Sequence, residues 1–237
     1  MAIAFRAFQD AHISSPNGTG HNGETGSLTI NKPTGTVNDD ILILSVVINY
    51  GNATLTGRTL PSGFTLLWDT WQSTSGDHWV VAWKRAASEG SNYTIQWTCD
   101  TEYVYADGIV AVYSGCNTGT VVDDYGEGSA TTTTSHVAPS KTATYTNDMM
   151  LALAVEDNYS SSTCSGFTER ADNSSTYSAK LYDKTLSASG ATGTADIVMG
   201  SGNGRAGTIL LIDATPTGGG GGLSIPVAMA QYRQRWN

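Results

Sequence analysis

The residues whose chemistry is easiest to recognise are four histidines, and they lie far apart in the sequence: His12, His21, His78 and His136. His12 and His21 share a glycine-rich stretch with Glu24, residues 12–26, which reads HISSPNGTGHNGETG. A zinc site needs ligands held in fixed geometry, and a glycine-rich loop does not hold them. We therefore predict no metal site in this stretch.

Carboxylates gather at Asp123, Asp124 and Glu127. Calcium takes oxygen ligands from flexible loops, but this spacing matches no calcium-binding loop. We expect solvated charges in a linker here, and no metal or other cofactor. No nucleophile or metal-protease motif occurs elsewhere, so we predict a protein that is not an enzyme. A glycan hydrolase remains an alternative, because its two carboxylates need proximity in space rather than in sequence.

One glycine motif, Gly202-Asn-Gly204-Arg-Ala-Gly207, has the G-x-G-x-x-G spacing of dinucleotide-binding loops. That site requires the loop to lead into a helix whose N-terminus holds the pyrophosphate. Here the loop leads into the apolar run 208–213. We therefore expect a glycine-rich hairpin.

Tryptophans form a third group with potential chemistry. Trp79 and Trp83 share one face of an expected strand and are predicted to lie in the core, whereas Trp68 and Trp71, three apart, should face differently. Flat aromatic rings also stack on pyranose sugars, and exposed coplanar rings in a groove would indicate sugar binding. The candidate glycan-binding residues are Trp68, Trp71, Tyr103 and Tyr105.

The elements that carry these residues occur twice, and a repeat is to be sought before any other feature. The stretch 38–50, NDDILILSVVINY, returns 109 positions later as NDMMLALAVEDNY. The SGFT of 62–65 returns at 165–168, the strand 79–85 at 179–184, and the strand 108–114 at 207–213. We therefore predict two pseudo-repeated β units.

In this alignment one face of the repeated strand is shared, and we predict that it points into the core. It comprises Leu42, Leu44 and Val46 in the first copy and Leu151, Leu153 and Val155 in the second.

The opposite face differs between the copies. In the first copy it is apolar, so it should be covered by another part of the chain or by a neighbouring subunit. In the second copy it should be more solvated, and Glu156 and Asp157 are expected on a solvated surface. In the first copy this face comprises Ile41, Ile43 and Val47, a candidate subunit interface. In the second copy it comprises Met150, Ala152 and Glu156.

Composition agrees with an all-β fold. Only 14 % of the residues are charged and 27 are glycine, as expected of short strands joined by tight polar turns. A net charge of −9 argues against a nucleic-acid partner. No apolar run approaches a membrane span, and the first residues lack a signal-peptide pattern, so we expect synthesis in the cytoplasm. Three cysteines, Cys99, Cys116 and Cys164, are expected as free buried thiols, with a Cys99–Cys116 bridge as the alternative.

These patterns divide the chain into six segments: an N-terminal strand and loop (1–26), a first β unit (27–116), a connection (117–135), a second β unit (136–214), a glycine linker (215–222) and a tail (223–237).

The tail has no counterpart in the repeat. It combines apolar residues with aromatic and arginine residues of the kind that dominate interfaces. We predict a docking peptide. The alternatives are a terminus without fixed structure and a strand on the same domain. The docking residues would be Leu223, Ile225, Val227, Met229, Tyr232, Arg233, Arg235 and Trp236.

A family resemblance rests on KPTGTVNDDILIL, PSGFTLL, WKRAASEG, YTIQW and GIVAVYSG, repeated more loosely through SGFTER and GTILLIDA. Over about residues 27–215 the chain resembles two-part β-sandwich modules of bacteriophage virion and phage-like surface proteins. The resemblance implies jelly-roll-like units that decorate a particle or cell surface. It brings no catalytic residues.

The resulting prediction is an all-β, jelly-roll-like β-sandwich of two pseudo-repeated units with a short C-terminal tail. As a function we predict a structural protein on the virion surface: a capsid decoration, head-fibre or tail-surface subunit attached through its tail. Expected partners are other virion proteins and further copies of the chain, with a host glycan as a further candidate. The alternative is a carbohydrate- or receptor-binding module.

Overall fold

The computed structural model describes residues 2–13, 25–49, 55–72, 77–99, 104–157, 161–173, 177–200 and 203–218. Every regular element in these ranges is a β-strand, and these strands pair in antiparallel fashion. The all-β prediction is therefore confirmed. The described residues include no helix long and apolar enough to cross a membrane.

The first eight strands form two sheets, and we call them the first unit. The larger sheet has the order β1-β8-β3-β6-β5, and the smaller sheet has the order β2-β7-β4. The segment 1–26 thus supplies β1, the edge strand of the larger sheet. The strands are β1 (Ala4–Ile13), β2 (Thr25–Asn31), β3 (Ile41–Asn49), β4 (Leu55–Thr59), β5 (Thr65–Gln72), β6 (Asp77–Arg85), β7 (Asn92–Cys99) and β8 (Tyr105–Ser114).

The second unit, β9 to β19, repeats this order. Its larger sheet reads β15-β16-β13-β19-β9 and its smaller sheet reads β10-β18-β14. The segment 117–135 is more than a connection, because it contains β9. The strands are β9 (Val122–Glu127), β10 (Ser135–Ala138), β11 (Thr142–Ala143), β12 (Tyr145–Thr146), β13 (Met149–Glu156), β14 (Thr163–Cys164), β15 (Thr168–Asp172), β16 (Ser178–Thr185), β17 (Gly190–Ala191), β18 (Ala195–Val198) and β19 (Gly204–Leu211), followed by β20 (Thr217–Gly218), which pairs with β12.

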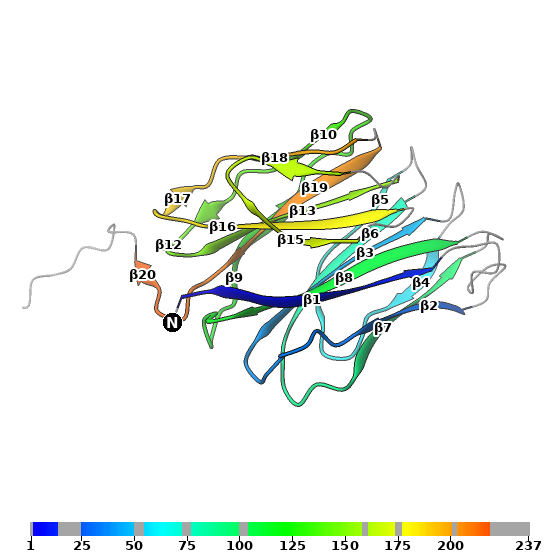
Figure 1. The fold of residues 1–237 in the computed structure, drawn as a ribbon, viewed down its shortest axis with the longest axis horizontal. Helices are drawn as coiled ribbons and strands as arrows, with labels where there is room; N and C mark the ends of the chain where they lie inside the picture. The colour runs from blue at the N-terminus through cyan, green and yellow to red at the C-terminus, as the bar shows by residue number, and fades with distance from the viewer. Residues whose placement is uncertain are drawn as a thin grey trace, which may run out of the picture.

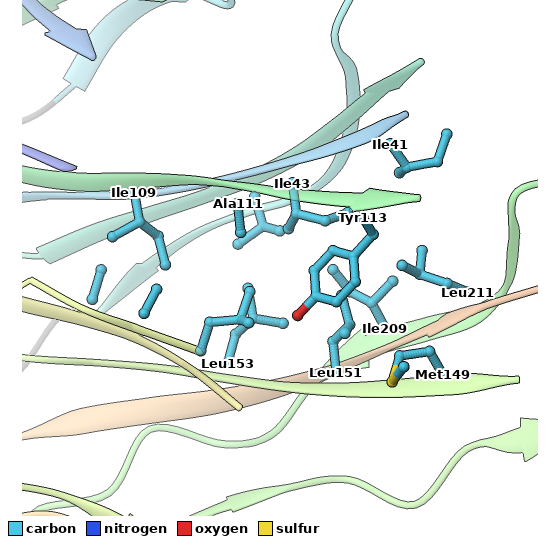
Figure 2. Packing of buried hydrophobic residues seen from close by; sticks show 14 of the residues in the cluster. Ile41, Ile43, Ile109, Ala111, Tyr113, Met149, Leu151, Leu153, Ile209 and Leu211 are labelled. Atoms are coloured by element: carbon cyan, nitrogen blue, oxygen red, sulfur yellow. The ribbon is translucent and has the colours of Figure 1, made fainter. Parts of the chain in front are cut away.

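The four sheets of three or more strands stack as four layers, with the two larger sheets face to face in the middle (Figure 1). Three apolar cores separate the layers, one within each unit and one between the units. In the core between the units, Ile43 and Ile109 of the first unit face Leu151 and Leu153 of the second (Figure 2). The apolar face of Ile41, Ile43 and Val47 is therefore covered by the same chain, and it offers no surface to a second copy.

The repeat is real, but its strand register differs by one residue from the sequence alignment. Asp39 and Asn147 both adopt positive φ, 70° and 69°, and their N–H groups donate to equivalent carbonyls, those of Ala86 (2.9 Å) and Leu186 (3.0 Å). Asp39 therefore corresponds to Asn147. The separation is 108 positions, whereas the alignment by residue identity gave 109.

Because side chains alternate along a strand, a one-residue shift exchanges the two faces. Leu42, Leu44 and Val46 lie in the core of the first unit, as predicted, but the residues aligned with them lie in the core between the units: Leu151, Leu153 and Val155.

The predicted solvated face of the second copy is wrong. Met150 and Ala152 are buried in the second unit's own core. Glu156 is only 1 % exposed, and its carboxylate accepts a hydrogen bond from Ser178 Oγ at 3.3 Å. Asp157 is half-buried and accepts a hydrogen bond from Asn203 Nδ2 at 2.8 Å. The strand β13 is thus covered on both faces, like β3.

The SGF turns are confirmed as equivalent. Gly63 and Gly166 both adopt left-handed φ, 82° and 78°, which L side chains rarely adopt. Phe64 and Phe167, which follow them, pack on the cores of their respective units. Cys116 and Cys164 are buried and free, as predicted, so Cys116 is not bridged to Cys99.

Candidate functional site

Polar residues from both units meet at one end of the sandwich, which we call the Trp71 end. There β3 ends at Asn49, opposite the first residues of β6 and β8, Asp77 and Tyr105. β13 ends at Glu156, opposite the first residues of β16 and β19. Two seams between the larger sheets reach this end, one beside β1 and β15 and one beside β5 and β9.

The first seam is centred on Asp107, which is fully buried on β8. Its carboxylate contacts His12 Nδ1 of β1 at 2.9 Å and accepts a hydrogen bond from the backbone N–H of Tyr177, in the second unit, at 3.2 Å. Asn173, also of the second unit, donates from Nδ2 to the Ala11 carbonyl at 3.0 Å. The two units are thus joined by directed hydrogen bonds where the apolar core ends.

The second seam is centred on Arg205 of β19. Its guanidinium donates to Glu127 of β9 at 2.9 Å and to the carbonyl of Trp71, in the first unit, at 3.4 Å. Thr70 Oγ1 donates to the other oxygen of Glu127 at 2.5 Å. Glu127 is therefore an ion-pair partner within the sandwich, not a solvated linker charge.

The strand pairing shows that the two seams are equivalent. Tyr113 and Leu211 occupy the same place opposite the first residues of β3 and β13, so Asp107 corresponds to Arg205. Thr70 pairs with Trp79, and Asn173 bonds in the same way to Ala179, the equivalent of Trp79. Thr70 therefore corresponds to Asn173. Residues at these two positions join the units at both seams. At one of the positions the first seam has an acidic residue, Asp107, and the second seam has a basic residue, Arg205. This arrangement is that of structural cross-links.

A third cluster closes this end of the first unit. His78 Nε2 lies 2.6 Å from Asp69 Oδ1, and Arg58 contacts the other oxygen of the same carboxylate. Burial, together with the positive charges of Arg58 and Arg205, lowers the pKa of His78 to about 4. The imidazole is therefore neutral at pH 7, and it serves the ion-pair cluster as an uncharged partner.

The predicted aromatic residues do not form one platform. Trp68 is 7 % exposed and packs edge-on against Trp79, with ring centroids 5.1 Å apart, in the core between the units. Trp71, on the other face of β5, is 49 % exposed. Tyr105 is half-buried beside Tyr177 (centroids 5.3 Å apart), and Tyr103 lies outside the described residues.

Trp79 is buried as predicted, and Trp83 packs partly buried against the same core. Trp68 and Trp71 lie on opposite faces of β5, so their rings cannot form one coplanar platform for a sugar.

The glycine motif has a packing role. A Cβ on Gly207 would lie 2.8 Å from the Trp68 ring, and a Cβ on Gly204 would lie 2.4 Å from the carbonyl oxygen of Val155. Both glycines belong to β19, and the chain continues from them as a strand to Leu211. The motif therefore allows close approach of neighbouring groups and leads into no helix that could hold a pyrophosphate. The expected hairpin is wrong, because β18 and β19 belong to different sheets.

The other two carboxylates of this acidic group, expected as solvated linker charges, are also engaged by the chain. Asp123 accepts hydrogen bonds from the N–H and Oγ1 of Thr144, at 2.5 and 2.8 Å, and Asp124 accepts one from Thr142 at 3.1 Å. Within the described ranges no group of three or more His, Cys, Asp or Glu residues is placed to hold a metal ion.

Compared with models of protein families, with curated proteins and with solved structures, the chain shows no significant match. The eight predicted docking residues, Leu223 to Trp236, lie outside the described residues.

The seam residues allow a first prediction. Asn173→Ala should lower the free energy of unfolding by about 1–3 kcal/mol, because it removes the hydrogen bond that the buried Asn173 side chain donates to the other unit. Urea unfolding measures the change. Asn92→Ala, an exposed asparagine that begins β7, serves as the control and should shift stability by no more than about 0.5 kcal/mol. Equal effects of the two changes would contradict the cross-linking role.

Proposed function

We propose that the protein is a non-enzymatic structural subunit of a bacteriophage particle, a capsid decoration, head-fibre or tail-surface protein, held by its C-terminal tail. In this proposal it is made in the host cytoplasm and carried on the virion surface. Its polar clusters act as cross-links between two jelly-roll-like units, and the strand order repeated in both units is compatible with that description.

The observation that carries the proposal is the position of β20. This strand pairs with β12, and it follows the bridge that joins Asp213 to Cys116 near the start of β1. Figure 1 shows β20 at the same end of the sandwich as the beginning of β1, opposite the Trp71 end. The chain thus leaves the four-layer body at this end after β20, and an anchor in that place leaves the Trp71 end free.

Removal of residues 223–237 is expected to abolish incorporation into particles while the β-sandwich stays folded. Virions carrying the full chain, the truncated chain, or a chain whose tail is replaced by glycine and serine would be purified and probed for the protein. The truncated and replaced proteins should be missing from the particles, and their thermal unfolding should match that of the full chain. Normal incorporation of either variant would rule out attachment through the tail.

Light scattering separates two kinds of partner. If the full chain is a defined oligomer and the truncated chain a monomer, the tail joins copies of the protein. If both are monomers, the tail binds another virion protein.

The second candidate is a carbohydrate- or receptor-binding module. The observation that favours it is the half-exposed Trp71 beside the Arg58–Asp69–His78 cluster, at the end opposite β20. Trp71→Ala should then reduce adsorption of particles to host cells without reducing the amount of protein on the particle.

A further inference from the structure

A cavity of about 300 Å³ opens in the first unit, at the end where β4 leads into β5 and β6 leads into β7. Small-molecule sites begin at roughly this volume. Its walls include Pro61 and Ser62 on one side and Asn92, Tyr93 and Thr94 on the other, with Lys84 and Glu89 between them.

The charged pair in this cavity is held in a fixed geometry. Lys84 Nζ lies 2.9 and 3.0 Å from the two oxygens of Glu89, whose side chain is only 4 % exposed. The N–H of Ala87 donates to the same carboxylate at 2.9 Å. Burial alone would raise the pKa of Glu89, but the bonds from Ala87 and Lys84 outweigh it and the net pKa is lowered. The carboxylate is therefore charged, and its neighbour neutralises it locally.

The glycine of the SGF turn makes room for this pair. A Cβ on Gly63 would lie 2.9 Å from Lys84 Cε. The lysine side chain therefore passes over the turn in space that the side chain of any residue larger than glycine would occupy. Gly166, the equivalent glycine in the second unit, has open space at the same place.

The second unit forms the same turn without the charged pair. Lys184, paired with Met150 as Lys84 is with Leu42, lies over the ring of Phe167 at 5.5 Å. Ala195 stands where the first unit has Tyr93, at the beginning of the inward-facing row of the equivalent strand. The second unit thus folds without a tyrosine at this place, and its lysine, Lys184, packs on an aromatic ring. Tyr93 and the Lys84–Glu89 pair exceed what this fold requires.

We propose that this cavity binds a neutral, hydroxyl-rich ligand, a single sugar residue of a glycan. A lysine donor and a carboxylate acceptor side by side match two adjacent sugar hydroxyls, each of which can accept and donate. The locally balanced charge disfavours an anionic or cationic ligand, and the volume suits one pyranose ring. This site goes beyond the structural role and does not depend on the tail.

Methyl glycosides of glucose, galactose, mannose and N-acetylglucosamine would be titrated into the full chain and followed by saturation-transfer NMR. At least one should bind, and Glu89→Gln should weaken it about tenfold, roughly 1.4 kcal/mol. Lys184→Met, in the second unit, should leave the affinity unchanged.

Asn92→Ala keeps the test decisive if Glu89→Gln does not fold, because Asn92 is exposed and lines the cavity without joining the Lys84–Glu89 pair. It should weaken the same glycoside at unchanged unfolding temperature. The proposal is overturned if none of the four glycosides binds, or if binding survives the cavity variants and is lost in Trp71→Ala. Neither result bears on incorporation into particles.

Discussion

Replacing Trp68 with alanine is expected to lower the free energy of unfolding by about 3–5 kcal/mol, the usual cost of removing a buried aromatic side chain. Trp68 is 7 % exposed and lies in the core between the units, edge-on to Trp79 and against Gly207. Because β5 belongs to one unit and β19 to the other, the cavity would open within the interface that joins them. Urea unfolding followed by circular dichroism measures the change.

Trp71→Ala is the matched control, three positions along the same strand. Its side chain is half exposed, so the change should cost clearly less, about 1–2 kcal/mol. Similar losses for the two tryptophans would contradict the burial of Trp68 between the units.

A double mutant tests the contact itself. Gly207→Ala alone should destabilise by about 1–3 kcal/mol, because its Cβ would meet the Trp68 ring at 2.8 Å and the Gly126 carbonyl oxygen at 3.2 Å. With Trp68→Ala present, the first of these clashes disappears, so the combined loss should fall short of the sum. Strict additivity would show that the two residues do not touch.

Strands, repeat and turns were accessible from the sequence because each leaves a local pattern. Apolar runs identified β3 and β13, and the recurring SGFT identified equivalent turns in the two units. The register was less accessible. Asn and Asp both tolerate left-handed φ, so matching Asn38 to Asn147 by identity hid the equivalence of Asp39 and Asn147.

The polar seams could not be predicted from local pattern at all. Their residues come from strands far apart in the chain, and Asp107 and Arg205 carry opposite charges at equivalent places. With the corrected spacing of 98 positions between β8 and β19, their correspondence follows from the sequence. The hydrogen bonds to Tyr177 and Trp71 do not, because they depend on how the two units face each other.

In the corrected register Asp40 is equivalent to Asp148. Both aspartates are buried, but their surroundings differ. Asp40 accepts hydrogen bonds from Arg6 Nε and from the Val37 N–H, both at 2.9 Å. Asp148 accepts one from the Asp213 N–H at 3.3 Å, and its second oxygen has no hydrogen-bond partner. Burial raises the pKa of Asp148 to about 6, with nearby Asp123 adding to the effect.

Asp148→Asn is therefore expected to stabilise the protein at pH 7. The folded protein holds the proton of Asp148 up to about pH 6, whereas the unfolded chain releases it near 3.8. Stability contributed by this group thus decreases as the pH rises from about 4 to 6, and at pH 7 the buried charge costs about 2–3 kcal/mol at 1.4 kcal/mol per pKa unit. Asparagine removes that cost and can still accept the bond from Asp213.

Asp40→Asn supplies the opposite result at the equivalent place. It removes an ion pair with Arg6 and should destabilise by about 1–3 kcal/mol at pH 7. Urea unfolding at pH 4.5 and pH 7 distinguishes the two sites: the gain from Asp148→Asn should shrink on acidification, since protonated aspartic acid and asparagine are alike in charge. A gain that is the same at both pH values would mean that it does not come from removal of a buried charge, and a loss at pH 7 would mean that Asp148 is charged and satisfied in the folded protein. The second unit would then bury the equivalent carboxylate as a charged group without an arginine partner.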